Sequence, residues 1–293
     1  MDNKPLVSIL LLSMNHESFI EQCINSLANQ TYENIEVIYV DNASSDKTFE
    51  IGQRLLQACG LPYKCFSNKE SKTISYNLNF LLQHSSGAFV SPLSTDDWFE
   101  PGNIQKKVEH LLFNPDVGAL FSNGWIFLQA EQKTILNDAS TFRRGYIFKE
   151  VLTQADCIFY VGVMYRRNIL DKVGNWDEHL LIEDTDMYIR IGSVAKIDFL
   201  EEPLVYYRRT SSSASKNKEF MLTGFRQYYE KYKNVSWINM KKWLAERYRR
   251  MAASDIDQKN CKQARLFLTE AIRLNPLGLQ NYKTLLYLLR QSF

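Results

Sequence analysis

The amino-acid sequence predicts an α/β fold with a doubly wound, mostly parallel sheet, flanking helices and a helical extension toward the C-terminus. In the first half of the chain, apolar runs of strand length alternate with segments of helical period, which is typical of parallel strands joined by crossover helices. After about residue 215 the strand-like runs cease. Hydrophobic residues make up 45% of the 293 residues, which is enough for a large buried core.

Five apolar runs are the candidate strands of the sheet. Each has the length of a typical strand. They lie at Val7–Leu12, Ile35–Val40, Tyr63–Phe66, Ala88–Leu93 and Val117–Phe121. Because ligands of doubly wound sheets bind beyond the carboxyl ends of the strands, the polar residues directly after these runs are the first candidates for a functional site.

Helical spacing of apolar residues predicts the crossover helices. The segment between the first two strands carries one apolar stripe of an amphipathic helix, formed by Phe19, Ile20, Cys23, Ile24, Leu27 and Ala28. A second helix is expected over Lys47–Leu56. A third follows Pro101, a residue tolerated in a first helical turn, and is expected to direct inward Ile104, Val108, Leu111 and Leu112.

We expect two domains, an α/β domain over residues 1–215 and a helical extension over residues 216–293. In the extension, the stretch Ala264–Pro276 looks like part of a tetratricopeptide repeat. A single repeat cannot form a solenoid, so we predict a packed helical hairpin there.

The segment 216–250 is strongly basic. It carries ten basic and three acidic side chains, with Trp237 and Trp243 interleaved. A basic aromatic helix can lie on an anionic membrane, so peripheral membrane contact through this segment is one expectation. A solvated basic face on a helix packed against the first domain is the alternative.

Composition argues against several other classes of protein. The 35 basic and 33 acidic residues nearly cancel, which is unlike a protein that binds nucleic acid. Five scattered cysteines lack the paired spacings of zinc sites and are typical of reduced thiols. The run Val7–Leu12 is too short to cross a membrane and lacks a signal-cleavage pattern. We therefore expect a cytoplasmic protein, with the inner face of the cytoplasmic membrane as its only membrane contact.

Two acidic turns follow predicted strands. The second strand leads into Asp41-Asn42-Ala43-Ser44-Ser45-Asp46, and the fourth leads into Ser94-Thr95-Asp96-Asp97-Trp98. Such residues also form turns and helix N-caps, which is the alternative for each turn alone. Adjacent carboxylates raise each other's pKa, however, and a divalent cation would neutralise them while the phosphates of a nucleotide complete its coordination shell. The first strand is not followed by a glycine-rich phosphate loop.

The order of motifs resembles that of the family 2 glycosyltransferases of the GT-A fold, over about residues 5–215. The motifs are a first loop ending in Asn15, then Gln30-Thr31-Tyr32, Val40 to Asp46, Asn77, Leu93 to Asp97, Gly174-Asn175-Trp176-Asp177-Glu178, and Glu183-Asp184. The resemblance implies transfer of a sugar from a nucleotide-sugar donor, with Mn²⁺ or Mg²⁺ on its diphosphate.

The resemblance also assigns roles to individual residues. It implies that Asp97 ligates the metal and that Asp184 is the general base of an inverting reaction. Asp41 would contact the nucleoside base, and Asp96 would lie near the ribose or sugar. It further implies nucleotide-sugar binding by Ser13, Asn15, Asn77 and Arg208. Alone, the Asp184 segment could equally be a helix start rich in capping residues.

Three departures from the family pattern keep other functions open. Met14 stands where an aromatic residue often stacks on the base, Ser94 replaces a first acid, and Thr210 replaces a histidine near the metal. The leading hypothesis is transfer of a hexose or N-acetylhexosamine, UDP-linked by family habit, to a hydroxyl of a glycan or lipid-linked oligosaccharide. The alternatives are a non-catalytic nucleotide- or glycan-binding module and a nucleotidyltransferase.

Overall fold

The chain divides into two compact units in a computed structural model. The structure describes residues 4–153, 157–210, 217–235 and 238–291. The first unit, the α/β unit, comprises the residues up to Glu178 together with Glu183–Ser211. The second, the helical unit, comprises His179–Ile182 and Ser212–Phe293. The expected boundary between residues 215 and 216 lies outside the described residues.

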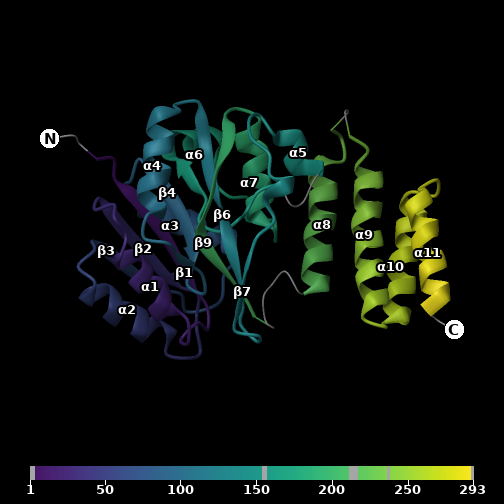
Figure 1. Ribbon diagram of the computed structural model, residues 1–293, viewed down its shortest axis with the longest axis horizontal. Helices are drawn as coiled ribbons and strands as arrows, with labels where there is room; N and C mark the ends of the chain where they lie inside the picture. Colours follow the sequence, from purple (N-terminus) through teal and green to yellow (C-terminus); the bar gives the residue numbers. More distant parts are fainter. Residues whose placement is uncertain (1–3, 154–156, 211–216, 236–237, 292–293) are drawn as a thin grey trace. The chain divides into compact units, whose positions relative to one another are not determined.

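The α/β unit is built on one mixed sheet (Figure 1). Its strands run in the order β3-β2-β1-β4-β8-β6-β9-β5, and β7 pairs with β6. The pairs β3-β2, β2-β1, β1-β4 and β6-β9 are parallel, and the others are antiparallel. The strands are β1 (Val7–Ser13), β2 (Ile35–Asp41), β3 (Tyr63–Ser67), β4 (Phe89–Ser94), β5 (Trp98–Phe99), β6 (Val117–Leu128), β7 (Lys133–Leu136), β8 (Met164–Arg166) and β9 (Lys196–Arg209).

The strand order places helices on both faces of the sheet. The chain moves outward from β1 to β2 and β3, then returns to the other side of β1 with β4. Since parallel crossovers are right-handed, this reversal sends successive connections to opposite faces. The helices of the unit are α1 (Ile20–Ala28), α2 (Thr48–Ala58), α3 (Ile74–Gln83), α4 (Asn103–Phe113), α5 (Phe148–Thr153), α6 (Arg167–Val173) and α7 (Glu183–Gly192), with a 3-10 turn at Ala139–Thr141.

The predicted fold class is confirmed, and all five predicted strands are present, as β1 to β4 and the first half of β6. The other four strands were not predicted. β5 and β8 have only two and three residues, β7 is exposed along its length, and β9 mixes buried and exposed residues without one continuous apolar run. The expected inward direction of Leu112 is wrong. Leu112 is exposed, since Ile104, Val108 and Leu111 already define the buried face of α4 and Leu112 lies about 100° further round.

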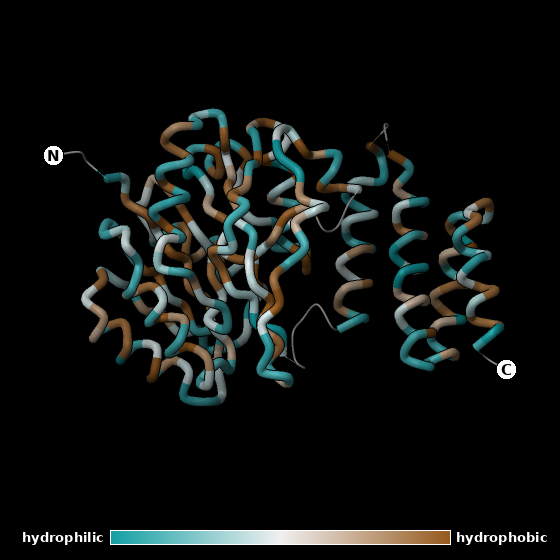
Figure 2. Tube along the Cα trace, viewed as in Figure 1, coloured by the Kyte–Doolittle hydropathy of each residue, from teal (hydrophilic) through white to brown (hydrophobic). Residues whose placement is uncertain are grey.

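The core of the α/β unit follows from the apolar runs of its central strands. All residues of β1 except Leu12 are buried, as are all residues of β2 except Glu36. Parallel strands covered on both faces need such continuous apolar runs. Hydrophobic segments accordingly concentrate in the strands and on the inner sides of the helices (Figure 2).

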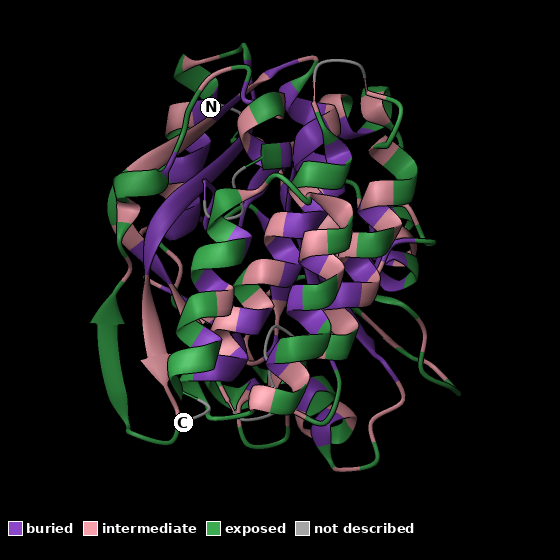
Figure 3. Cartoon of the chain, turned by 90° about the vertical axis from the view of Figure 1, so that its right-hand side faces the viewer, coloured by how far each residue is buried: buried purple, intermediate pink, exposed green. Residues whose placement is uncertain are grey.

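The helical unit consists of packed helices with their own core. These are α8 (Lys218–Tyr232), α9 (Met240–Asp257), α10 (Cys261–Leu274) and α11 (Leu279–Gln291). The stretch that resembles a tetratricopeptide repeat forms α10, which packs against α9 and α11. Its buried residues share a cluster with Leu244, Tyr248 and Leu288. Each of these helices has buried residues, and Figure 3 shows exposed residues beside buried ones on the helices that face the viewer. Among the described residues, no helix combines the length and the hydropathy needed to span a bilayer.

Candidate functional site

Three strand ends meet at one edge of the sheet. β1 lies between β2 and β4, parallel to both. In this register Ser13 is paired with Asp41, and Leu12 is paired with Ser94. The loops after the three strands therefore converge at the point where the strand order reverses, which is where doubly wound sheets bind ligands.

The first loop and the Asp41 turn form one hydrogen-bond network. The Ser13 hydroxyl donates to Asp41 Oδ1 at 2.8 Å, and the Ser44 N–H donates to Asp41 Oδ2 at 2.9 Å. Asn15, in a left-handed conformation with φ of 56°, accepts from the Ser45 N–H at 2.9 Å. Its own N–H donates to the Ser44 hydroxyl at 2.8 Å. The structure thus brings together three of the residues predicted to bind the donor, Ser13, Asn15 and Asp41.

Asn77 extends this polar region through two other asparagines. It is fully buried on α3 and accepts at 2.7 Å from the Asn68 side-chain amide, which also donates to Asn42 at 3.0 Å. Asn42 accepts a further hydrogen bond from the Lys72 N–H at 2.8 Å. Sequence reasoning assigned no role to Asn42 or Asn68. The strand-end position of Asn42, directly after Asp41, is the signal that could have pointed to it.

The Asp96-Asp97 turn follows β4. Asp97 is buried, and its Oδ1 accepts from the Arg208 backbone N–H at 2.8 Å. Burial and the neighbouring Asp96 carboxylate raise the pKa of Asp97 well above its ordinary value. Asp96 is half-buried, with His16 Nε2 at 4.0 Å from its Oδ2. His16 also contacts the Thr95 hydroxyl at 2.9 Å, so the first loop touches this turn as well.

Arg208 holds the Asp96-Asp97 turn through hydrogen bonds from its backbone and its side chain. Its side chain is buried, and Nε donates to the Asp96 carbonyl at 2.9 Å. Its terminal nitrogens donate to Gln129 and Gln22, each at 2.5 Å. The guanidinium also lies 4.6 to 5.2 Å from the ring centroids of three aromatic side chains, Phe19, Trp98 and Phe127. Its predicted contact with the donor stays a prediction, while its observed contacts hold the turn in place.

A pocket of about 240 Å³ opens beside Asp97. Asp97 lines it together with Glu183 and Asp184, which begin α7. Aromatic side chains form much of the remaining wall, and Tyr188 stacks on both Tyr160 and Tyr165. The other aromatic residue of the wall is Trp176. Glu183, Tyr160 and Tyr165 were not predicted as site residues. Glu183 could have been noticed as the neighbour of Asp184, whereas no motif marks the two tyrosines.

Glu183 and Asp184 form a close acidic pair. Burial raises the pKa of both, and the Asp184 carboxylate raises that of Glu183 further. The Thr185 N–H and hydroxyl donate to Asp184 Oδ1 at 2.5 and 3.2 Å, which favours the ionised form of Asp184. The two carboxyl groups therefore titrate as a coupled pair.

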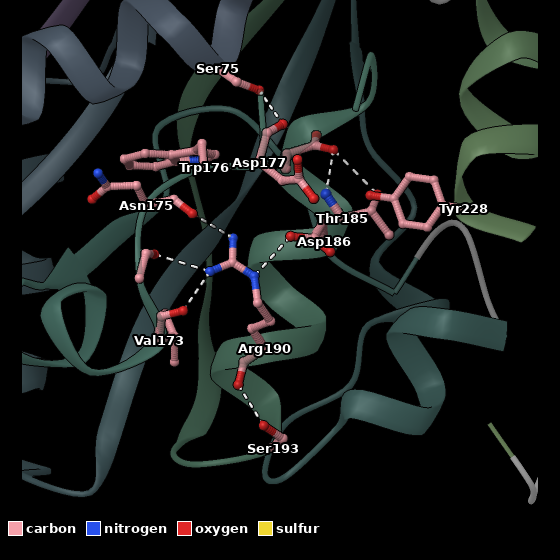
Figure 4. A network of polar contacts seen from close by, with 12 residues as sticks. Ser75, Val173, Asn175, Trp176, Asp177, Thr185, Asp186, Arg190, Ser193 and Tyr228 are labelled. Atoms are coloured by element: carbon pink, nitrogen blue, oxygen red, sulfur yellow. Dashed lines mark hydrogen bonds and ion pairs between the residues drawn. The ribbon is translucent and has the colours of Figure 1, made fainter. Parts of the chain in front are cut away.

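Hydrogen bonds made by three side chains hold the walls of the pocket in place. Arg190 donates to Asp186 Oδ2 at 2.8 Å and to the backbone carbonyls of residues 173, 174 and 175, so α7 is tied to the segment that leads into Trp176 (Figure 4). Asn79 on α3 makes hydrogen bonds with both the N–H and the carbonyl of Trp176, each at 2.9 Å. On another wall, the buried Lys107 donates to the Gly162 carbonyl at 2.7 Å.

The carboxylates fit a cation that is shared with a ligand. Within the described ranges, no group of three histidine, cysteine or acidic side chains could hold a metal ion alone. Asp97 is nevertheless a buried carboxylate beside a second acid, with a protein donor on Oδ1. Mg²⁺ and Mn²⁺ commonly take one or two carboxylates and complete their shell with substrate phosphates. Asp97 is therefore a suitable metal ligand only in company with a phosphate-bearing ligand.

Comparisons with known proteins identify a family and several relatives. The model of the Glycosyl transferase family 2 matches residues 8–174. An uncharacterized glycosyltransferase of Haemophilus influenzae is 27% identical over 226 residues, which are 73% of this chain and 69% of that protein. Other curated relatives are matched over as little as 20% of their length.

Solved structures share the fold at low sequence identity. S. aureus TarS 1-349 in complex with UDP-GlcNAc has a TM-score of 0.67 and 18% identity, covering 98% of this chain and 89% of TarS 1-349. Mannosyltransferase PcManGT from Pyrobaculum calidifontis, in complex with GDP-Man and Mn²⁺, has a TM-score of 0.60 and 15% identity, covering 99% of this chain and 87% of that one.

Replacing Arg208 by lysine is expected to destabilise the α/β unit and to lower nucleotide affinity. Lysine keeps the charge but cannot reproduce the three side-chain hydrogen bonds or the planar stacking. We expect the free energy of unfolding in urea to fall by about 3 kcal/mol. Arg209→Lys is the matched control, because Arg209 is exposed and its replacement should change stability by less than about 0.5 kcal/mol. Unchanged stability with weaker nucleotide binding would instead support the predicted donor contact of Arg208.

Proposed function

Because the chain belongs to glycosyl transferase family 2, we propose that it is an inverting glycosyltransferase. It transfers a hexose or N-acetylhexosamine from a nucleotide sugar to a hydroxyl of a glycan or lipid-linked oligosaccharide. One observation carries the proposal. Asp97 from the β4 turn and Asp184 from α7 line the same pocket, so a candidate metal ligand and a candidate base border one cavity.

The donor is proposed to bind across the ends of β1, β2 and β4. Nucleotide sugars in the TarS and PcManGT complexes support this class of donor, and UDP-GlcNAc in TarS supports a UDP-linked one. The Ser13, Asn15 and Asp41 network would receive the nucleoside, with Asn77 beside it. Asp96 would lie nearer the sugar, since its turn adjoins the pocket through Asp97.

Asp97 would hold Mn²⁺ or Mg²⁺ together with the donor diphosphate. Burial and the repulsion between the neighbouring carboxylates of Asp96 and Asp97 raise the pKa of Asp97. A bound cation would offset this repulsion. The Mn²⁺ of the PcManGT complex supports a divalent cation as the partner of the donor. When bound, the cation supplies charge stabilisation for the leaving diphosphate.

Asp184 would act as the general base toward the acceptor. It takes the proton of the acceptor hydroxyl while that oxygen forms a bond to the anomeric carbon and the bond from this carbon to the diphosphate oxygen breaks. Attack opposite the leaving group inverts the anomeric centre. Thr185 holds Asp184 by two hydrogen bonds and favours its ionised form. Tyr160, which is partly exposed in the pocket wall, would offer a ring face to the acceptor sugar.

Nucleotide binding should depend on a divalent cation and on Asp97. We expect UDP to bind in Mn²⁺, measured by isothermal titration, with affinity falling about tenfold or more in chelator. Asp97→Asn should bind UDP equally weakly with and without Mn²⁺, because the neutral amide is a poor ligand for the cation. GDP and dTDP, tested in parallel, define the base preference. No metal-dependent binding of any of the three nucleotides would refute the metal assignment.

Asp184→Asn should abolish transfer while leaving donor binding intact. Loss of a general base lowers kcat by about 10²-fold to 10⁴-fold, and the neutral amide cannot accept the acceptor proton. The readout is donor turnover followed by mass spectrometry, with a panel of nucleotide sugars. Glu183→Gln is the neighbouring control and should retain far more activity. If Asp184→Asn hydrolyses the donor as fast as the wild type, Asp184 is not the base, and turnover by neither protein would favour a non-catalytic module.

The pH dependence should report the raised pKa of Asp184. A base must be ionised, so kcat/KM should fall as the pH drops through the pKa of the Glu183-Asp184 pair. Because burial raises both pKa values, this fall should occur well above pH 3.8, the ordinary pKa of an aspartate. Glu183→Gln should leave this fall in place, because burial, and not the charge of Glu183, raises the pKa of Asp184. A fall that moves to lower pH in Glu183→Gln would show instead that ionised Glu183 raises the pKa of Asp184.

A further inference from the structure

The exposed large apolar side chains of the helical unit lie on α10, α11 and the turn between them. Every large hydrophobic side chain that is exposed among its described residues lies between residues 266 and 289. Two of them, Leu277 and Leu279, are 90% and 76% exposed in and just after the turn that joins α10 to α11. Apolar side chains this exposed mark an interaction surface when they occur together.

The outward face of α11 continues this surface. Four of its exposed large apolar side chains follow one another at intervals of three, four and three positions, which places them on one stripe of the helix. They are Leu279, Tyr282, Leu286 and Leu289. Tyr287 is also exposed, but it lies off this stripe, and its hydroxyl donates to Asp257. Asn281, Thr284 and Leu288 occupy the opposite, buried side. The docking surface is defined here as Leu277 together with this stripe.

Positive charge borders the docking surface. Lys283 and Arg290 are exposed on α11, each four positions after a leucine of the stripe, and are therefore its neighbours on the helix. Residues 259–291 contain six basic side chains and a single acidic one, Glu270, which is paired with Arg273 at 2.7 Å. An apolar stripe edged by Lys and Arg is the pattern of a helix that lies in the interface of an anionic bilayer.

The basic segment 216–250 lacks the apolar part of this pattern. Three of its described aromatic residues, Phe225, Tyr229 and Trp243, pack against the core of the helical unit. No large hydrophobic side chain is exposed in the portion of 216–250 that the structure describes. A second copy of the chain fits the docking surface poorly, because two α11 stripes in antiparallel contact would oppose Lys283 and Arg290 of one copy to those of the other.

We propose that the turn between α10 and α11 and the outward face of α11 bind an anionic membrane surface. Leu277, Leu279 and Leu286 enter the headgroup boundary, while Lys283 and Arg290 contact anionic headgroups. The inference goes beyond the transfer reaction and does not rest on it. Such binding would hold the protein at the surface where a lipid-linked acceptor resides.

The test is flotation of the full chain with vesicles made of equal parts phosphatidylcholine and phosphatidylglycerol. The wild type should float with these vesicles, float less with pure phosphatidylcholine, and be released by added salt. Leu277→Ser with Leu279→Ser should lower vesicle binding about tenfold or more, because two apolar side chains no longer enter the bilayer. Lys283→Glu with Arg290→Glu should lower binding to the anionic vesicles about tenfold.

Matched controls separate this surface from others. Leu112→Ser with Phe113→Ser removes two exposed apolar residues from α4 and should leave binding unchanged. Lys241→Glu with Lys242→Glu makes the same charge change within segment 216–250 and should have a smaller effect than the α11 pair. Circular dichroism and thermal unfolding verify that each variant is folded.

Three results would overturn the proposal. The first is a folded wild type that does not float with the anionic vesicles. The second is a loss of binding in Lys241→Glu with Lys242→Glu that exceeds the loss in the α11 variants. The third is a wild type that self-associates without vesicles and becomes monomeric in Leu277→Ser with Leu279→Ser, which would identify a protein interface instead.

Discussion

The hydrogen bond from the Arg208 backbone N–H to Asp97 joins β9, the last strand along the chain, to the Asp96-Asp97 turn. Two adjacent carboxylates, one of them buried, are held in a turn where their repulsion opposes ionisation. Arg208 compensates by supplying a backbone donor to Asp97 and a side-chain donor to the Asp96 carbonyl. Its burial among aromatic rings fixes it in that position, because the guanidinium bonds and the stacking restrict it from several directions.

The pocket combines parts that come from separate layers of the α/β unit. The sheet contributes Asp97, α7 contributes the Glu183-Asp184 pair, and α3 holds Trp176 through Asn79. Arg190 then ties the start of α7 to the segment before Trp176. The proposed base and the proposed metal ligand thus stand on different elements, which is what a displacement between an acceptor and a leaving diphosphate requires.

Two residues that depart from the family pattern, Met14 and Ser94, lie in different parts of the site. Met14 is exposed at the donor end, with its sulfur 3.9 Å from the Asn42 amide nitrogen and from the Ser71 hydroxyl. Ser94 lines the pocket beside Asp97, so a hydroxyl stands where the resemblance to the family predicts an acid. The proposed donor end therefore combines the buried Asp41 with asparagine and serine side chains, and Asp97 is the buried acid of the Asp96-Asp97 turn.

By itself, the sequence determined the fold class, the five strands with continuous apolar runs, the family, and which acids follow the strands, because periodicity and motif order are local properties of the chain. Only the tertiary structure decided that Arg208 is enclosed behind Asp97, that Glu183 joins Asp184 in one pocket, and that Tyr160 belongs to its wall. It also decided which aromatic residues of the helical unit face inward and which leucines face outward. These outcomes depend on packing between residues that are distant in the sequence, and burial, hydrogen bonding and pKa are set by that packing.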